Sequence, residues 1–227
     1  MNYLVIAAHP DDEILGVGGS MAKWSKSGDK VNILIMAEGS TSRDYTRDTI
    51  AHKNKLMALK KAATEAAKTL GVVSVELIGL PDNRMDSLDL LDIVKLIENK
   101  INILKPDTVV THHHGDLNID HKLINQAVLT ACRPQPDQNV KTIITFEVPS
   151  STEWQSPTLN ESFIPNWFVD ISDTINVKMD ALESYSTEMR KWPHSRSLKA
   201  VEHLARWRGA TIGKKAAEAF MLVRETK

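Results

Sequence analysis

Short apolar runs alternate with amphipathic segments over the first two thirds of the chain. The apolar runs are typical of buried parallel strands and occupy residues 3–8, 31–36, 72–78, 107–111 and 141–148. Between them, helical periodicity or helix-favouring composition covers residues 16–27, 52–70, 88–104 and 120–132. Such alternation predicts an α/β fold with a parallel sheet wrapped by helices. Right-handed crossovers favour a Rossmann-like strand order of 3-2-1-4-5.

The last third of the chain is less regular. Loops rich in Ser, Pro and Trp lead into predicted helices near residues 173–187 and 197–224. Because no flexible linker marks a boundary, we expect a single domain over residues 1–227. In this domain residues 1–149 form the Rossmann-like core, and residues 150–227 form an irregular extension packed on that core.

Composition excludes several classes of protein. The chain carries 28 Lys and Arg against 29 Asp and Glu, and this near-neutral charge argues against a nucleic-acid partner. No stretch reaches the roughly 18 uninterrupted apolar residues of a membrane span, so we expect no stable membrane insertion. Cys132 is the single cysteine, which rules out an intrachain disulfide and a Cys-based structural zinc site. The unpaired cysteine and the lack of a basic signal region lead us to expect a cytoplasmic protein.

The first cluster with chemical potential is the segment HPDDE at residues 9–13, which is followed by Gly16, Gly18 and Gly19. A dinucleotide fingerprint would explain the glycines and Glu38, but the spacing is wrong and three acids would face a pyrophosphate. Alternatively, the acids only cap the next helix, where the helix dipole favours negative charge. The third interpretation is a metal site, since a histidine and a carboxylate three positions apart can bind one cation.

The second cluster, THHHGDLNIDH at residues 111–121, follows the fourth predicted strand. In the predicted strand order, strands one and four are neighbours, so His9 and His121 would both line the crevice beyond their carboxyl ends. A histidine, a carboxylate and a second histidine form the open ligand set that catalytic zinc requires. Asp120 either holds a histidine of this site in its tautomer or only caps the following helix.

Together, HPDDE with its glycines and GDLNIDH resemble the LmbE-like/PIG-L family of N-acetylglucosaminyl deacetylases. The similarity also covers residues 105–107, 147–154, 208–209 and 217–220. The resemblance implies that His9, Asp12 and His121 hold zinc, or another divalent metal, and that Asp11 is the general base. It also implies hydrolysis of an N-acetyl group from an amino sugar: the metal polarises the amide carbonyl, and Asp11 moves a proton from water to the leaving amine.

The chain departs from one family pattern at Asn118. Relatives with an HPDH motif have a histidine there that helps to stabilise the oxyanion, whereas an amide can donate a hydrogen bond but supplies no positive charge. Another histidine could compensate. His194 is our first choice, and His112, His113 and His114 are the alternatives.

Substrate contacts are expected from the loops. Arg43, in the loop after the second strand, is a candidate to bind a substrate oxygen or phosphate. Trp154 and Trp192 lie in loops where their rings could stack on a sugar, whereas we expect Trp167 and Trp207 to tie the extension to the core.

The sequence therefore predicts a zinc-dependent hydrolase that removes an N-acetyl group from a small amino sugar or conjugate. The alternatives are a nucleotide-binding oxidoreductase and a non-catalytic metal- or sugar-binding protein, and a homo-oligomer is left open. The predicted site comprises the metal ligands His9, Asp12 and His121, the catalytic residues Asp11, Asn118, Asp120 and His194, and the substrate-binding residues Arg43 and Trp154.

Overall fold

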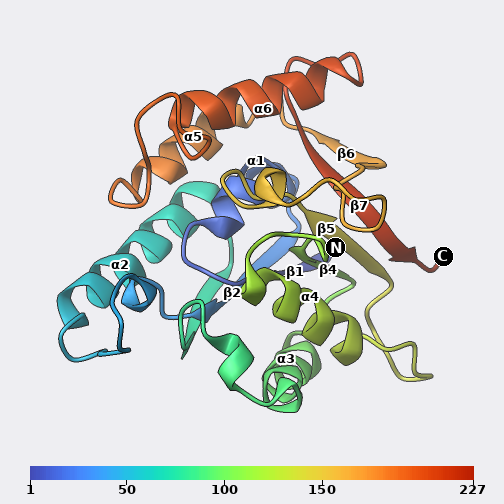
Figure 1. Ribbon diagram of the computed structural model, residues 1–227. Helices are drawn as coiled ribbons and strands as arrows, with labels where there is room; N and C mark the ends of the chain where they lie inside the picture. Colours follow the sequence, from blue (N-terminus) through green and yellow to red (C-terminus); the bar gives the residue numbers. More distant parts are fainter.

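The computed structural model describes residues 1–227. A single seven-stranded sheet forms the centre of the molecule. The strands are β1 (Asn2–Ala7), β2 (Lys30–Ala37), β3 (Ser74–Leu80), β4 (Thr108–His112), β5 (Thr142–Phe146), β6 (Trp167–Asp170) and β7 (Ala217–Glu225). Their order in the sheet is β3-β2-β1-β4-β5-β7-β6 (Figure 1). The first five pair in parallel, which confirms the predicted order, and β7 and β6 extend the sheet in the antiparallel sense.

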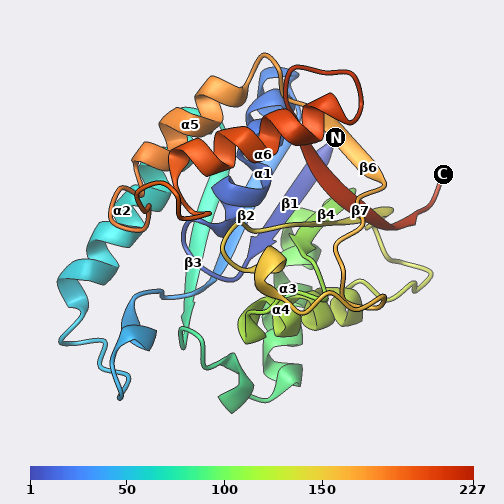
Figure 2. The same cartoon turned by 45° about the horizontal axis from the view of Figure 1, so that its top comes forward.

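Helices cover both faces of the sheet. The α-helices are α1 (Asp12–Lys26), α2 (Lys53–Leu70), α3 (Leu90–Leu104), α4 (Ile119–Ala131), α5 (Ile175–Glu183) and α6 (Leu198–Ala210), and the 3₁₀-helices are η1 (Thr41–Arg43), η2 (Met85–Ser87) and η3 (Thr152–Trp154). Figure 2 shows α5 and α6 on the side of α1 and α2, whereas α3 and α4 pack on the opposite face. None of these helices combines the length and the apolar character needed to cross a bilayer.

The central strands have continuous apolar sequences because helices cover both of their faces. Along β1, Tyr3 and Val5 belong to the core beneath α1 and α2, whereas Leu4 and Ile6 belong to the core beneath α3 and α4. This alternation follows from the two-residue period of a strand. The glycines after β1 also have a packing role, since a Cβ on Gly16 would lie only 2.2 Å from the ring of Phe146.

The predicted helix over residues 197–224 is wrong beyond Ala210. The chain turns at Gly213, whose φ is +70°, and returns as β7, which pairs with both β5 and β6. The turn is so tight that a Cβ on Gly209 would lie 2.6 Å from Cα of Ala216. Residues 216–220 are all buried, which fits a strand covered on both faces better than an amphipathic helix.

The extension departs from its sequence reading in two further places. β6 was not predicted, and the helix expected at residues 173–187 is shorter, at Ile175–Glu183. Trp167 does pack against the hydrophobic core beneath α1 and α2, and its ring lies 5.5 Å from that of Phe220. The same prediction is wrong for Trp207, which is 65% exposed.

Candidate active site

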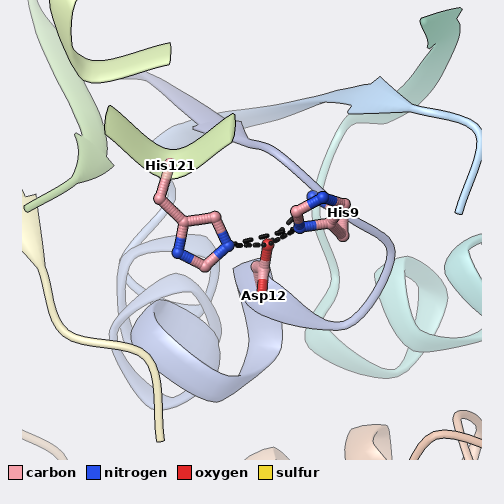
Figure 3. A group of neighbouring side chains, drawn as sticks. All are labelled: His9, Asp12 and His121. Carbon is pink, nitrogen blue, oxygen red and sulfur yellow. Dashed lines mark hydrogen bonds and ion pairs between the residues drawn. The ribbon is translucent and has the colours of Figure 1, made fainter. Parts of the chain in front are cut away.

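His9, Asp12 and His121 converge at the carboxyl ends of β1 and β4. His9 follows β1, Asp12 begins α1, and His121 lies in the first turn of α4. Asp12 Oδ2 is 3.1 Å from His9 Nδ1 and 3.1 Å from His121 Nε2, and the two ring nitrogens are 3.2 Å apart (Figure 3). The adjacency of β1 and β4 therefore brings together side chains that are 112 positions apart in sequence.

This ligand triad (His9, Asp12 and His121) has the chemistry of a metal site. Zinc bonds of about 2.0–2.1 Å in tetrahedral geometry place neighbouring ligand atoms about 3.3 Å apart, close to the observed separations. Two ring nitrogens that face each other at 3.2 Å cannot both carry a proton comfortably. Asp12 Oδ1 is buried without a hydrogen-bond partner, which is costly unless something else binds it. These residues fit one divalent cation.

The charges of the triad reinforce one another. Burial would lower the pKa of His121, but Asp12 and Asp116 raise it to about 9. Burial likewise opposes protonation of His9, yet its contacts with Asp12 and Asp120 raise its pKa well above the usual value. The two histidines in turn hold the pKa of Asp12 well below its usual range, despite its burial. Asp12 is therefore an anion at neutral pH, and it favours positive charge at this point, either on a protonated histidine or on a bound cation that replaces the proton between the two rings.

Asp120 supports His9 rather than His121. Its Oδ2 lies 3.1 Å from His9 Nε2 and accepts a hydrogen bond of 2.7 Å from the backbone N–H of Asn83. Its Oδ1 accepts another from the backbone N–H of Met85, at 3.1 Å. A carboxylate fixed in this way orients the ring so that Nδ1 faces the cation site. Asp120 is not the helix cap, because Asn118 caps α4 by accepting from the N–H of Asp120.

Asp116 has the corresponding place behind His121, a role that the sequence reading missed. Its Oδ1 lies 3.1 Å from His121 Nδ1, and the hydroxyls of Ser151 and Thr152 donate to its carboxylate. Burial raises the pKa of Asp116, but His121 and these hydrogen bonds bring it well below the usual value. Asp116 could have been predicted from the segment GDLNIDH. A histidine that binds a metal, such as His121, needs a hydrogen-bond acceptor for its second ring nitrogen, and Asp116 is a nearby carboxylate in that segment.

Asp11 and Glu13 sit at the strained start of α1. Asp11 has φ +111° without being a glycine, a conformation found where surrounding contacts enforce it. Glu13 supplies such contacts: its Oε2 accepts from the Asp11 N–H at 3.0 Å, and its Oε1 accepts from the Tyr185 hydroxyl at 2.6 Å. Burial raises the pKa of Asp11 to about 7, although Arg196 opposes the shift. Burial also raises the pKa of Glu13 to about 8.

A cavity of about 220 Å³ opens beside the triad. It is lined by His9, Pro10, Asp11, Gly39, Ser40, Ser42, Arg43, Leu59, Asp82, Asn83, Asn118, His121, Ser150, Ser151, Glu188 and Arg196. Nearly all of this lining is polar. Five of the predicted site residues belong to it: His9, Asp11, Arg43, Asn118 and His121. Arg43 pairs with Glu188 across the cavity, and the Asn118 amide donates to Asn83 Oδ1 at 2.7 Å.

The candidate oxyanion histidines do not line this cavity. His112 accepts from the Ala8 N–H at 2.7 Å and stacks on His121, with ring centroids 3.9 Å apart. His113 and His114 contact backbone carbonyls in the loop at residues 160–161. His194 Nδ1 accepts a hydrogen bond of 3.0 Å from the backbone N–H of Arg196.

Trp154 is 54% exposed and stands outside the cavity lining, edge to face with His194 at 5.7 Å. Three charged residues in the lining, Asp82, Glu188 and Arg196, were not predicted from the sequence. Arg196, just before α6, places Nη1 3.1 Å from Asp11 Oδ2. Its neighbour His194 is a candidate catalytic residue from the sequence, but no sequence pattern gives the arginine a role.

Comparison with known proteins agrees with this geometry. The sequence model of the family described as PIG-L, GlcNAc-PI de-N-acetylase, matches residues 4–132. An uncharacterized deacetylase of Escherichia coli K12, YaiS, is 30% identical over 81% of this chain and 90% of its own length. A probable N-acetyl-alpha-D-glucosaminyl L-malate deacetylase 2 of Bacillus subtilis 168 is 27% identical over 82% of this chain and 83% of its own length.

Two solved structures have the same fold. N,N′-diacetylchitobiose deacetylase from Pyrococcus horikoshii superposes with a TM-score of 0.77 at 19% identity, over 98% of this chain and 84% of the other. GalB, a 4-carboxy-2-hydroxymuconate hydratase from Pseudomonas putida, gives 0.77 at 21% identity, over 100% of this chain and 99% of the other. At these identities the similarity establishes the fold alone. The sequence match spans more than half of the chain, and this protein therefore belongs to the PIG-L, or LmbE-like, deacetylase family.

Proposed function

We propose that this protein is a zinc-dependent hydrolase that removes the N-acetyl group from a small amino sugar or amino-sugar conjugate. The observation that carries the proposal is the ligand triad, three ligand atoms within 3.1–3.2 Å of one another at the edge of a polar cavity. His9, Asp12 and His121 would hold the ion. The chemistry that zinc supplies is Lewis acidity, which polarises a carbonyl and makes water acidic near neutral pH.

Asp11 is the proposed general base. Asp11 lines the cavity and directly precedes the ligand Asp12 in sequence, so it lies beside the proposed reaction centre. It takes a proton from the attacking water and delivers it to the nitrogen of the departing amine. Burial raises the pKa of Asp11 above that of an ordinary aspartate, which favours its taking up a proton before passing it on. Asp120 and Asp116 keep the two histidine rings in place during this cycle.

The cavity determines which part of the substrate is enclosed. Its volume of about 220 Å³ and its polar lining suit one sugar ring, whose hydroxyls require hydrogen-bond partners. We propose that Arg43 binds a substrate oxygen and that Asn118 donates to the oxyanion through its free amide hydrogen. Trp154 and His194 would contact the part of a conjugate that projects out of the cavity.

The relatives are named for N-acetyl sugars that carry different attached groups. The Bacillus relative is named for an L-malate conjugate of N-acetylglucosamine, and the Pyrococcus enzyme for N,N′-diacetylchitobiose. These names motivate a panel that varies the group attached to the same N-acetyl sugar. They also predict that a free amine, rather than a released sugar, is the product.

The deciding experiment measures amine release from such a panel, with the protein purified, stripped by a chelator and reloaded with zinc. We expect release from at least one N-acetyl sugar, its loss after chelation, and its recovery with zinc. Because GalB shows that a hydratase shares this fold, an unreactive panel would refute the proposal whatever the fold similarity. Binding of a nicotinamide dinucleotide without amine release would favour the oxidoreductase alternative instead.

A further inference from the structure

Arg196 carries a charge from the extension into the candidate active site. It lies two residues before α6, and it is 64 positions beyond the end of the family match at residue 132. Its side chain reaches the start of α1 and lines the cavity, and about a quarter of it (24%) is exposed. The partner it meets there, Asp11, is 185 positions away in sequence.

The guanidinium of Arg196 is held at two points. Nη1 donates to Asp11 Oδ2 at 3.1 Å, and Nε donates to the Ser150 hydroxyl at 2.9 Å. The backbone of Arg196 is also fixed, because its N–H donates to His194 Nδ1 and its carbonyl accepts from the Arg190 N–H. A planar group with two anchors has little freedom to rotate, so it presents Nη1 to Asp11 in one orientation.

The side chain of Asp11 depends on this contact. Arg196 is its one hydrogen-bond partner among side chains, and Glu13 and the helix hold only its backbone. Oδ2 of Asp11 accepts the hydrogen bond from Arg196, whereas Oδ1 of Asp11 makes no hydrogen bond within the protein. The pair therefore defines which oxygen of Asp11 is free to take a proton.

We propose that Arg196 is a positioning residue that holds the carboxylate of Asp11 in the orientation needed for proton transfer. This inference rests on the proposed function, because it assigns Asp11 the role of general base. It makes the extension part of the active site: residues 150–227 supply the group that orients a side chain of the N-terminal motif. Ser150 contributes by orienting Arg196 in turn.

A purely electrostatic role would require only a positive charge near Asp11, and a lysine would provide it. The forked geometry requires a guanidinium, because a single ammonium cannot reach Asp11 and Ser150 with the same two directed N–H groups. The two roles can therefore be separated by comparing Arg196→Lys with Arg196→Ala.

The kinetic test uses the zinc-loaded full-length protein with N-acetylglucosamine as the probe. We expect Arg196→Ala to lower kcat about 100-fold, because misplacing a reacting group by about 1 Å has costs of this order, with KM changed less than about threefold. Arg196→Lys should recover only a small part of this loss, and Ser150→Ala should have a smaller effect in the same direction. Added guanidinium should restore part of the Arg196→Ala rate and leave Arg196→Lys unchanged.

The matched control is Arg206→Ala, which removes an exposed arginine of α6 that pairs with Glu202 on the same helix. This variant should keep the parent kcat. Full activity of Arg196→Lys would overturn the positioning role and favour simple charge compensation. Unchanged kcat in Arg196→Ala would remove Arg196 from the mechanism.

Crystal structures test the proposal independently of enzyme activity. Crystal structures of the zinc-loaded parent and Arg196→Ala should show the Asp11 carboxylate in one orientation in the parent and rotated or in several conformers in the variant. An Asp11 carboxylate that keeps its place in Arg196→Ala would overturn the proposal, even if the rate falls. Failure of the parent on every N-acetyl sugar would refute the proposed function, and these crystal structures would still settle what Arg196 does.

Discussion

Two clusters of buried charges contact α1, one along the helix and one at its N-terminal end, and they differ in which polar atoms lack a hydrogen-bond partner. The first pairs Lys178 with Glu218, and their side-chain atoms Nζ and Oε1 are 2.6 Å apart. Glu218 also accepts from the N–H groups of Gly19 and Ser20, and Lys178 donates to the carbonyl of Leu15. Both charged groups are thus paired and hydrogen-bonded within the protein, which is the arrangement that a buried ion pair requires to be tolerated.

The second cluster is the ligand triad with Asp11. Here Asp12 Oδ1 has no hydrogen-bond partner, Asp11 Oδ1 is free, and the cavity opens beside them. The comparison shows that burial of charge does not by itself mark a functional site. A buried carboxylate oxygen that lacks a partner beside a cavity is the better indicator, because a ligand bound in the cavity can satisfy it. The five predictions below test this contrast, from the largest expected effect on turnover to the smallest.

Removal of a triad ligand should have the largest effect. We expect His121→Ala to lower the zinc content from about one ion per chain to near zero and to abolish amine release, since two remaining ligands hold zinc poorly. Metal analysis after gel filtration measures this. His203→Ala, which removes an exposed histidine of α6, is the control. If His121→Ala bound zinc as tightly as the parent, the ligand set would be wrong.

Asp11→Asn should separate chemistry from metal binding. The amide keeps the shape of the carboxylate but cannot accept a proton, so we expect turnover to fall by roughly 10²–10⁴-fold. Zinc content should stay at the parent value, because Asp11 lies outside the triad. A loss of zinc in parallel with activity would show that Asp11 is a ligand rather than a base.

Asn118→Asp should distinguish helix capping from oxyanion stabilisation. Aspartate caps a helix as well as asparagine does, so stability should change little, but the donating N–H groups are lost. If Asn118 serves the oxyanion as proposed, turnover should fall by roughly 10–1000-fold. Asn118→Ala should additionally lower the free energy of unfolding by about 1 kcal/mol. An unchanged rate in Asn118→Asp would leave Asn118 as a cap alone.

Asp116→Asn should weaken the support of His121. We expect zinc affinity or turnover to fall by about 10–100-fold, the usual cost of losing a carboxylate behind a metal-binding histidine. Competition against a chromogenic chelator measures the affinity. Unchanged affinity and turnover would mean that Ser151 and Thr152 give Asp116 a purely structural role.

Glu218→Gln should affect stability and leave chemistry alone. It leaves Lys178 buried without a counter-charge, and breaking a buried pair in this way costs about 3–5 kcal/mol of the free energy of unfolding. Urea denaturation measures the loss. Turnover per folded, zinc-loaded molecule should match the parent, and a specific catalytic defect would contradict the division between the two clusters.

Local patterns were sufficient to predict much of the core and the triad. The apolar runs and helical segments of the first 148 residues predicted five strands in their observed order. Four of them, β1, β2, β4 and β5, are covered on both faces and are therefore apolar almost throughout, whereas β3 lies at the edge and is partly exposed. That order was enough to bring His9 and His121 together, since the carboxyl ends of neighbouring parallel strands meet at one edge.

The sequence by itself thus determined the family, the parallel sheet and the convergence of the triad, because each of these is encoded by short-range periodicity or by a compact motif. Only the tertiary structure decided the place of β7 in the sheet, the support of His9 by Asp120 and of His121 by Asp116, and the contact of Arg196 with Asp11. The physical reason is that a contact between segments far apart in the chain produces no characteristic spacing of residues in the sequence. An arginine 185 positions from its partner resembles any other loop arginine until packing directs it into the cavity.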